Sequence, residues 1–132
     1  HGRNFVEAIL VKAQKGEQLK VVNDQVGRPT YTVDLSEATL RLLDAQARGI
    51  AHFANSGHCS WHEFAEEIVR QAGLSVSVEA LSSAELGRPA QRPAYSVLDL
   101  SSYEKAASAT PRHWKEALAD FMQRRNIDGK AA

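Results

Sequence analysis

Residues 19–30 read LKVVNDQVGRPT, and they join a short apolar run to a polar loop that stands in front of a helix. The run from Leu19 to Val22 is typical of a short strand. Gly27 and Pro29 interrupt regular structure, so we expect a loop from Asn23 to Thr30. In open α/β folds, ligand contacts lie where a loop follows a strand and precedes a helix. This stretch therefore predicts an α/β fold with a candidate binding loop.

Helical periodicity continues on both sides of this stretch. Apolar residues at helical spacing predict a helix from Phe5 to Ala13. A second helix is expected to begin at Asp34, since Glu37 completes a capping box, and to end at Gly49. The clearest helix follows Ser60, which is a capping residue with Glu63 three positions on, and its apolar stripe includes Trp61. The same reasoning predicts three later helix starts: Ser82 with Glu85, Ser101 with Glu104, and Thr110 with Pro111.

Few segments have the pattern of strands. Residues 50–54 resemble a buried strand, and residues 75–80 an edge strand. We therefore predict an α/β fold class with helices packed on a small sheet, some of whose strands pair with polypeptide outside this chain. One domain is expected over residues 4–125. Residues 1–3 read as a tag remnant or cloning boundary, and residues 126–132 as a frayed tail.

Composition excludes several classes of partner. The 132 residues carry 16 basic and 16 acidic side chains, so no net field favours nucleic acid or an anionic membrane. No apolar run approaches the roughly 20 residues that span a bilayer. The single cysteine, Cys59, excludes an internal disulfide, which favours a cytoplasmic location. A metal site at His58, Cys59 and His62 is disfavoured, because no second pair of ligands completes it.

The loop from Asn23 to Thr30 offers donors for a polar ligand. Gln25, Arg28 and Thr30 carry groups suited to sugar hydroxyls or phosphate, Gly27 can adopt a positive φ, and Pro29 stiffens the backbone. The alternative is a polar turn that satisfies its own backbone.

A second candidate segment holds Arg88 and Arg92, which lie near prolines. Two guanidinium groups on such a segment could clamp a diphosphate, and the alternative is an exposed loop with unrelated charges.

Catalytic signatures are absent from the sequence. There is no glycine-rich turn of the Gly-x-Gly-x-x-Gly type and no Tyr-x-x-x-Lys pair. No convergent set of acid, base or metal ligand can be assembled, so we predict no catalytic residue and no metal ligand in this chain.

Several motifs resemble one enzyme family. Residues 21–30 are similar to the Asp/Asn-Asp-Gln-x-Gly-x-Pro-Thr segment of dTDP-4-dehydrorhamnose reductases, which are extended short-chain dehydrogenase/reductases. Ala51 departs from the family pattern, which has an aromatic residue there. Further segments resemble the family in the same order along the chain: Asn4 to Val6, Gly49 to Phe53, Ser56 to Ala65, Arg92 to Asp99 and Pro111 to Leu118.

The resemblance implies the C-terminal, substrate-side part of such a reductase in dTDP-L-rhamnose biosynthesis. In the family, the front half holds the NADPH-binding Rossmann strands and the Tyr/Lys pair. The chain alone is therefore expected to bind no cofactor and to be inactive. The implied ligand is a dTDP-linked 4-keto sugar, and the implied partner is the missing N-terminal Rossmann half. The residues carried over as substrate-binding are Gln25, Gly27, Pro29 and Thr30 in the loop, with Arg92, Pro93 and Ser96 as a second wall.

Two other readings remain open. The chain could be a stand-alone, non-catalytic module of the same family that binds a partner or forms a homodimer through the surface the Rossmann half would cover. It could also be related to nucleotide-sugar epimerases, which share the extended architecture. The Gln25 loop and the Arg92-Pro93 pair favour the reductase branch.

Overall fold

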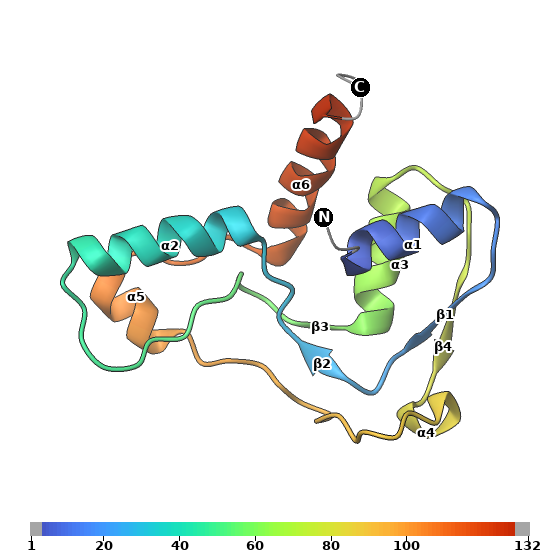
Figure 1. Cartoon of the computed structure of the whole chain (residues 1–132), viewed down its shortest axis with the longest axis horizontal. Coiled ribbons are helices and arrows are strands. Elements are labelled where there is room, and N and C mark those ends of the chain that lie inside the picture. The colour runs from blue at the N-terminus through green and yellow to red at the C-terminus, as the bar shows by residue number, and fades with distance from the viewer. Residues whose placement is uncertain (1–3, 129–132) are drawn as a thin grey trace. The chain divides into compact units, whose positions relative to one another are not determined.

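The computed structural model describes residues 4–128 and divides the chain into two compact units. Unit 1 comprises His1–Gly27 and Cys59–Ser96, and unit 2 comprises Arg28–His58 and Val97–Ala132. This division differs from the single domain predicted over residues 4–125. The expected tag remnant at residues 1–3 lies outside the described residues. Figure 1 gives the element labels.

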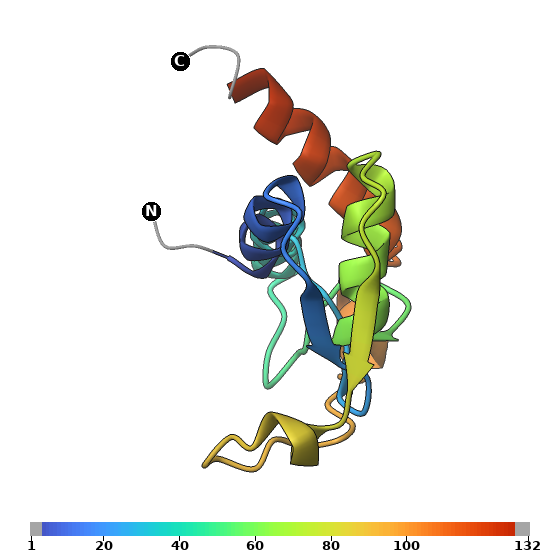
Figure 2. The same ribbon diagram turned by 90° about the vertical axis from the view of Figure 1, so that its right-hand side faces the viewer.

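Unit 1 is built on two parallel strands, β1 (Leu19–Val22) and β4 (Val78–Leu81), which pair in register from Leu19 with Val78. Helix α3 (Trp61–Gln71) contacts both strands, and α1 (Phe5–Gln14) contacts β1 and α3 (Figure 2). The predicted fold class, helices packed on a small sheet, is confirmed in this unit. Its core residues are apolar side chains of these elements: Ile9, Leu10, Leu19, Val21, Phe64, Ala65, Ile68 and Val69.

The helix starts in unit 1 follow the capping patterns of the sequence. Ser60 accepts a hydrogen bond from the Glu63 backbone N–H at 3.1 Å, and the Glu63 carboxylate accepts from the Ser60 N–H at 2.7 Å. Both capping boxes predicted here, before α3 and before the short α4 (Ser83–Leu86), are confirmed. Trp61 was predicted to be a core residue, which is wrong. It packs on Phe5 with ring centroids 4.7 Å apart, but it lies in the first turn of α3 and 44% of it stays exposed.

A second, two-stranded pairing lies beside the candidate loop. Strand β2 (Val26–Gly27) pairs antiparallel with β3 (Cys59–Ser60). The sequence predicted only loop at β2, because two residues carry no periodic signal and form a strand only through their partner.

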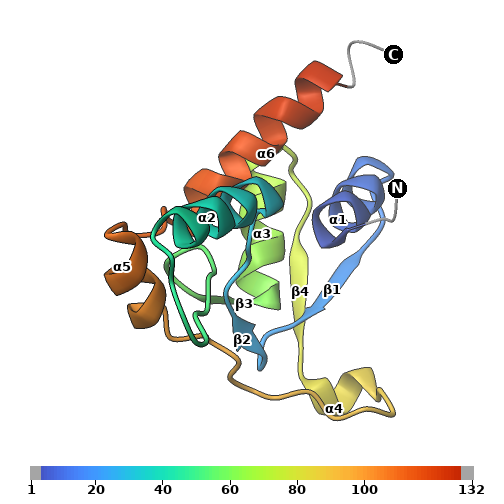
Figure 3. The ribbon, with the colours of Figure 1, turned by 60° about the vertical axis from the view of Figure 1, so that its left-hand side comes forward.

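Unit 2 is helical in its regular structure. Helix α2 (Thr32–Asp44) contacts α5 (Ser101–Ala107), and Figure 3 shows the two side by side. Helix α6 (Trp114–Asp128) completes the unit. Buried side chains of this unit include Ala38, Ala54, Leu100, Tyr103, Trp114, Ala117 and Leu118.

The capping predicted at three helix starts in unit 2 is wrong. Helix α2 begins at Thr32 because the Asp34 carboxylate binds Arg112 and Asn55 instead of capping. Helix α5 begins at Ser101 itself, because the Asp99 carboxylate accepts hydrogen bonds from the Ser101 N–H and hydroxyl.

Helix α6 begins at Trp114, three residues after Pro111. Its C-terminal end reaches Asp128, whereas the frayed tail was expected from Asn126, and residues 129–132 lie outside the described residues. Among residues 4–128, no helix combines the length and apolarity needed to cross a membrane.

The strand predicted at residues 50–54 is also wrong. The segment forms no strand, and Ile50 at its start is 83% exposed. A strand exists only when a neighbour completes its hydrogen bonds, and no other described segment pairs with this one. The apolar pattern that predicted a buried strand is therefore present without the pairing that would bury it.

Candidate functional site

The candidate loop starts in unit 1, where its first residues are fixed against α4. The Asp24 carboxylate accepts hydrogen bonds from the Ser83 N–H at 2.8 Å and the Ser83 hydroxyl at 2.7 Å. These bonds, the backbone one first, hold the pKa of Asp24 below its ordinary value. The Gln25 side-chain amide donates to the Ser83 Oγ at 2.7 Å. One donor of Gln25 is therefore used within the protein, and it holds the side chain in a defined position.

Gly27 and Ser96, two predicted site residues, lie close together in unit 1. The Val26 N–H donates to the Ala94 carbonyl at 2.8 Å, and the Ser96 N–H donates to the Val26 carbonyl at 2.9 Å. A Cβ atom at Gly27 would lie 3.2 Å from the Ser96 hydroxyl oxygen. Gly27 has no positive φ, so the expectation that it supplies one is wrong. The absence of a side chain instead allows the two segments to approach.

The other two residues of the second wall are exposed. Arg92 and Pro93 lie at the surface in the stretch without regular structure before Ala94. No short contact fixes the Arg92 guanidinium in the described part of the chain, whereas Ser96 is tied to β2 by its backbone and its hydroxyl.

The loop continues into unit 2 at Arg28. The Thr30 hydroxyl donates to the Arg28 carbonyl at 3.1 Å, the local bond of a self-satisfied turn. Pro29 is half-buried and Thr30 is exposed. The Nε atom of Arg28 is buried and has no hydrogen-bond partner among the described residues. Arg28 also lowers the pKa of Asp99, after the larger effect of the hydrogen bonds from Ser101.

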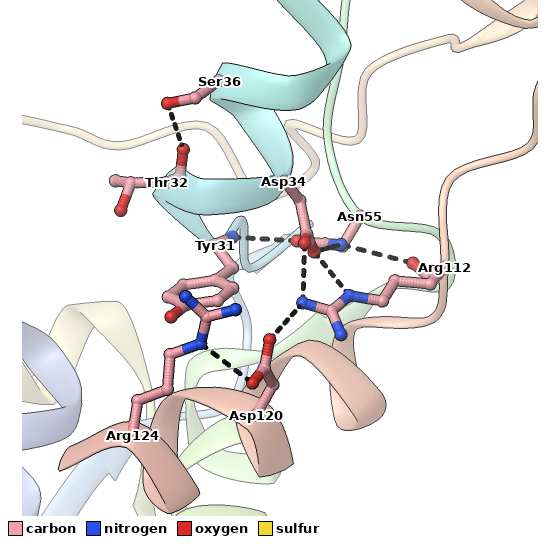
Figure 4. A network of polar contacts seen from close by, with 8 residues as sticks. All are labelled: Tyr31, Thr32, Asp34, Ser36, Asn55, Arg112, Asp120 and Arg124. Carbon is pink, nitrogen blue, oxygen red and sulfur yellow. Dashed lines mark hydrogen bonds and ion pairs between the residues drawn. The ribbon is translucent and has the colours of Figure 1, made fainter. Parts of the chain in front are cut away.

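The end of the loop is anchored by a fully buried asparagine. Asn55 is 0% exposed, and its Oδ1 accepts a hydrogen bond from the Tyr31 N–H at 2.8 Å (Figure 4). Its Nδ2 donates to the Asp34 carboxylate at 2.5 Å and to the Arg112 carbonyl at 3.4 Å. These partners fix the orientation of the amide, since only oxygen can accept from an N–H and only NH₂ can donate to a carboxylate.

An ion-pair network supports this asparagine. Arg112 binds Asp34 through two hydrogen bonds, of 2.8 and 2.6 Å, and reaches Asp120 at 2.9 Å (Figure 4). Arg124 binds the other oxygen of Asp120 at 3.1 Å. The hydrogen bond to Asp34 is the main cause that raises the pKa of Arg112, and the bond from Arg112 is the main cause that lowers the pKa of Asp120. These shifts favour the charged forms of Arg112 and Asp120.

Sequence reasoning missed this network. Asp34 and Arg112 are 78 positions apart, and no local pattern pairs them. The one available signal was a polar residue, Asn55, directly after an apolar segment.

Side chains pack closely around the turn at Gly57. Gly57 has a φ of +76°, and a Cβ atom there would collide with the imidazole of His113, so only glycine fits this position. Three or more His, Cys, Asp or Glu side chains do not converge on one metal position anywhere in residues 4–128.

Comparison with known proteins gives a consistent family. The model of the RmlD substrate binding domain matches residues 1–127. The spore coat polysaccharide biosynthesis protein SpsK of Bacillus subtilis (strain 168) is 46% identical over 125 residues, which are 95% of this chain and 44% of that protein.

Solved structures agree. A dTDP-4-dehydrorhamnose reductase from Clostridium acetobutylicum ATCC 824 matches with a TM-score of 0.90 and 40% identity, over 95% of this chain and 45% of that one. The reductase from Bacillus anthracis str. Ames, solved in complex with NADP, matches with a TM-score of 0.89 and 34% identity, over 94% and 44%. The chain thus spans less than half the length of these relatives, and it belongs to the family of RmlD substrate binding domains.

Proposed function

We propose that this chain is the substrate-binding portion of a dTDP-4-dehydrorhamnose reductase and holds a dTDP-linked 4-keto sugar. The observation that carries the proposal is the family match over residues 1–127, which spans every segment from which binding residues were predicted. Gln25, Gly27, Pro29 and Thr30 contribute the pocket loop. Arg92, Pro93 and Ser96 contribute a second wall.

The geometry supports this assignment in two ways. The segment of Ser96 lies against Gly27, so two stretches about 70 positions apart in sequence meet within unit 1. Arg92 is exposed on the same stretch as Ser96, and its planar guanidinium suits a diphosphate.

The reduction itself requires polypeptide beyond these residues. We propose that NADPH and the proton donor belong to an N-terminal Rossmann half that joins this chain in the complete enzyme. Unit 2 supports such a partner, because large apolar side chains of α2 and the following segment are exposed: Leu35, Leu40, Leu43 and Ile50. The same surface would serve the alternative, a stand-alone module that forms a homodimer, and the mass of the purified chain in solution distinguishes a dimer from a monomer.

A titration tests the binding proposal. The chain is joined to the front half of the Bacillus anthracis relative, and its amide signals are followed while dTDP is added. We expect the signals of Gln25 and Thr30 to shift. Replacing Arg92 with Ala should weaken binding about tenfold through the lost charged hydrogen bonds.

Arg48→Ala is the matched control, since Arg48 is also exposed but lies outside the candidate segments. Unmoved signals of Gln25 and Thr30 at saturating dTDP would show that the loop does not bind the nucleotide.

A further inference from the structure

Asn55 connects the candidate loop to a charge network on distant parts of unit 2. Its Oδ1 accepts the hydrogen bond from the Tyr31 N–H, and Tyr31 directly follows Thr30. Tyr31 is also the N-cap residue of α2, and its side chain makes no capping bond. The Asn55 oxygen accepts from the Tyr31 N–H, as the N3 side chain does in a capping box.

The partners of Asn55 are themselves held in place. Asp34 is fixed by two hydrogen bonds from Arg112, and Arg112 is fixed in turn by Asp120. The Arg112 guanidinium also lies 5.8 Å from the centroid of the Tyr31 ring, and that ring meets Phe121 edge-on at 6.0 Å. The backbone of Tyr31 is therefore restrained by Asn55, and its side chain by Arg112 and Phe121.

We propose that Asn55, oriented by the Asp34–Arg112 ion pair, is a positioning residue that sets the conformation of Pro29 and Thr30 for ligand binding. This inference rests on the proposed function, because it assumes that the loop binds dTDP. A buried amide is suited to the task, since it has a defined orientation and a strong penalty for losing its partners. Asn55 touches no ligand itself and acts through Tyr31.

The first test uses amide hydrogen exchange in the full chain. Asn55→Ala removes the acceptor for the Tyr31 N–H, so exchange at Tyr31 should accelerate about tenfold or more relative to amides in the centre of α2. Tyr103→Leu is the control, because Tyr103 is buried in the same unit, where its ring packs edge-on against Phe53. It should accelerate exchange without singling out Tyr31. Equal behaviour of the two variants would overturn the proposal.

The second test asks whether the anchor matters for binding. In the joined protein that the dTDP titration uses, Asn55→Ala should weaken dTDP binding roughly tenfold, and Tyr103→Leu should leave it near the starting value. If the unchanged protein binds no dTDP, the proposed function fails and this inference falls with it. If it binds and Asn55→Ala binds equally well, only the positioning role is refuted.

A swap of the two polar groups guards against simple misfolding. Asn55→Asp alone puts two carboxylates side by side and should behave like Asn55→Ala. Combined with Asp34→Asn, it restores one amide facing one carboxylate and keeps an acceptor for Tyr31. The double variant should recover slow Tyr31 exchange and part of the dTDP affinity that Asn55→Asp loses, because Arg112 then faces an amide at position 34 and the ion pair is gone. A double variant no better than Asn55→Asp would contradict the proposal.

Discussion

At the scale of single residues, contacts within the protein explain the positions of two side chains that the sequence singled out. Gln25 and Gly27 were predicted as ligand residues from the resemblance of their loop to the reductase family. In the structure, Gln25 is held by Ser83, and Gly27 makes room for Ser96. Neither partner could be foreseen from the sequence. The contact of Gln25 with Ser83 spans about 60 positions and depends on how β1 pairs with β4. The contact of Gly27 with Ser96 spans about 70 positions and depends on how residues 94–96 meet β2. Their role as ligand residues stays a prediction.

Gly27 gives the prediction that belongs to this scale. We expect Gly27→Ala to lower the free energy of unfolding by about 1 kcal/mol, since the new Cβ must displace the Ser96 hydroxyl from a 3.2 Å contact. Unfolding in urea measures the change. Gly27→Ala combined with Ser96→Ala should lose less than Gly27→Ala alone, because the crowded oxygen is gone. A stabilised Gly27→Ala variant would show that the approach of the two segments is not tight.

At the scale of elements, capping patterns predicted some helix starts and failed at others for a definite reason. Ser60 with Glu63 and Ser101 with Glu104 have the same spacing. The first forms a capping box, but Asp99 takes the N–H and the hydroxyl of Ser101 and moves the start of α5. A local motif thus decides a helix start only when no stronger acceptor stands beside it. The 50–54 segment fails for another reason, since pairing is not a local property.

The two serines therefore make a matched pair of variants. Ser60→Ala should cost about 1 kcal/mol of stability, because it leaves the Glu63 N–H of a buried helix start without its acceptor. Ser101→Ala should cost only a few tenths of a kcal/mol, since the Ser101 N–H keeps its bond to Asp99. Urea unfolding followed by circular dichroism measures both. Equal losses would show that the spacing, and not the observed bonds, decides the effect.

At the scale of the whole molecule, the family and the fold class were predictable from the sequence, and the division into two units was not. The ordered motifs from Asn4 to Leu118 indicated the family that the match over residues 1–127 shows. The boundaries between units fall inside short connections with no change of composition, such as Gly27 to Arg28, so no linker marks them. The large apolar side chains of α2 that stay exposed, among them Leu40 and Leu43, could not be foreseen either, because burial on that face depends on what covers it.

The central claim is that this chain provides the substrate site and that the front half of the enzyme carries out the reduction. The most direct test is the oxidation of NADPH in the presence of a dTDP-linked 4-keto sugar. The measurement compares the 132-residue chain with the same chain joined to the front half of the Bacillus anthracis relative. We predict no turnover by the chain alone and measurable turnover by the joined protein, with loss of activity when the Gln25–Thr30 loop is altered. Turnover by the 132-residue chain without any partner would contradict the account.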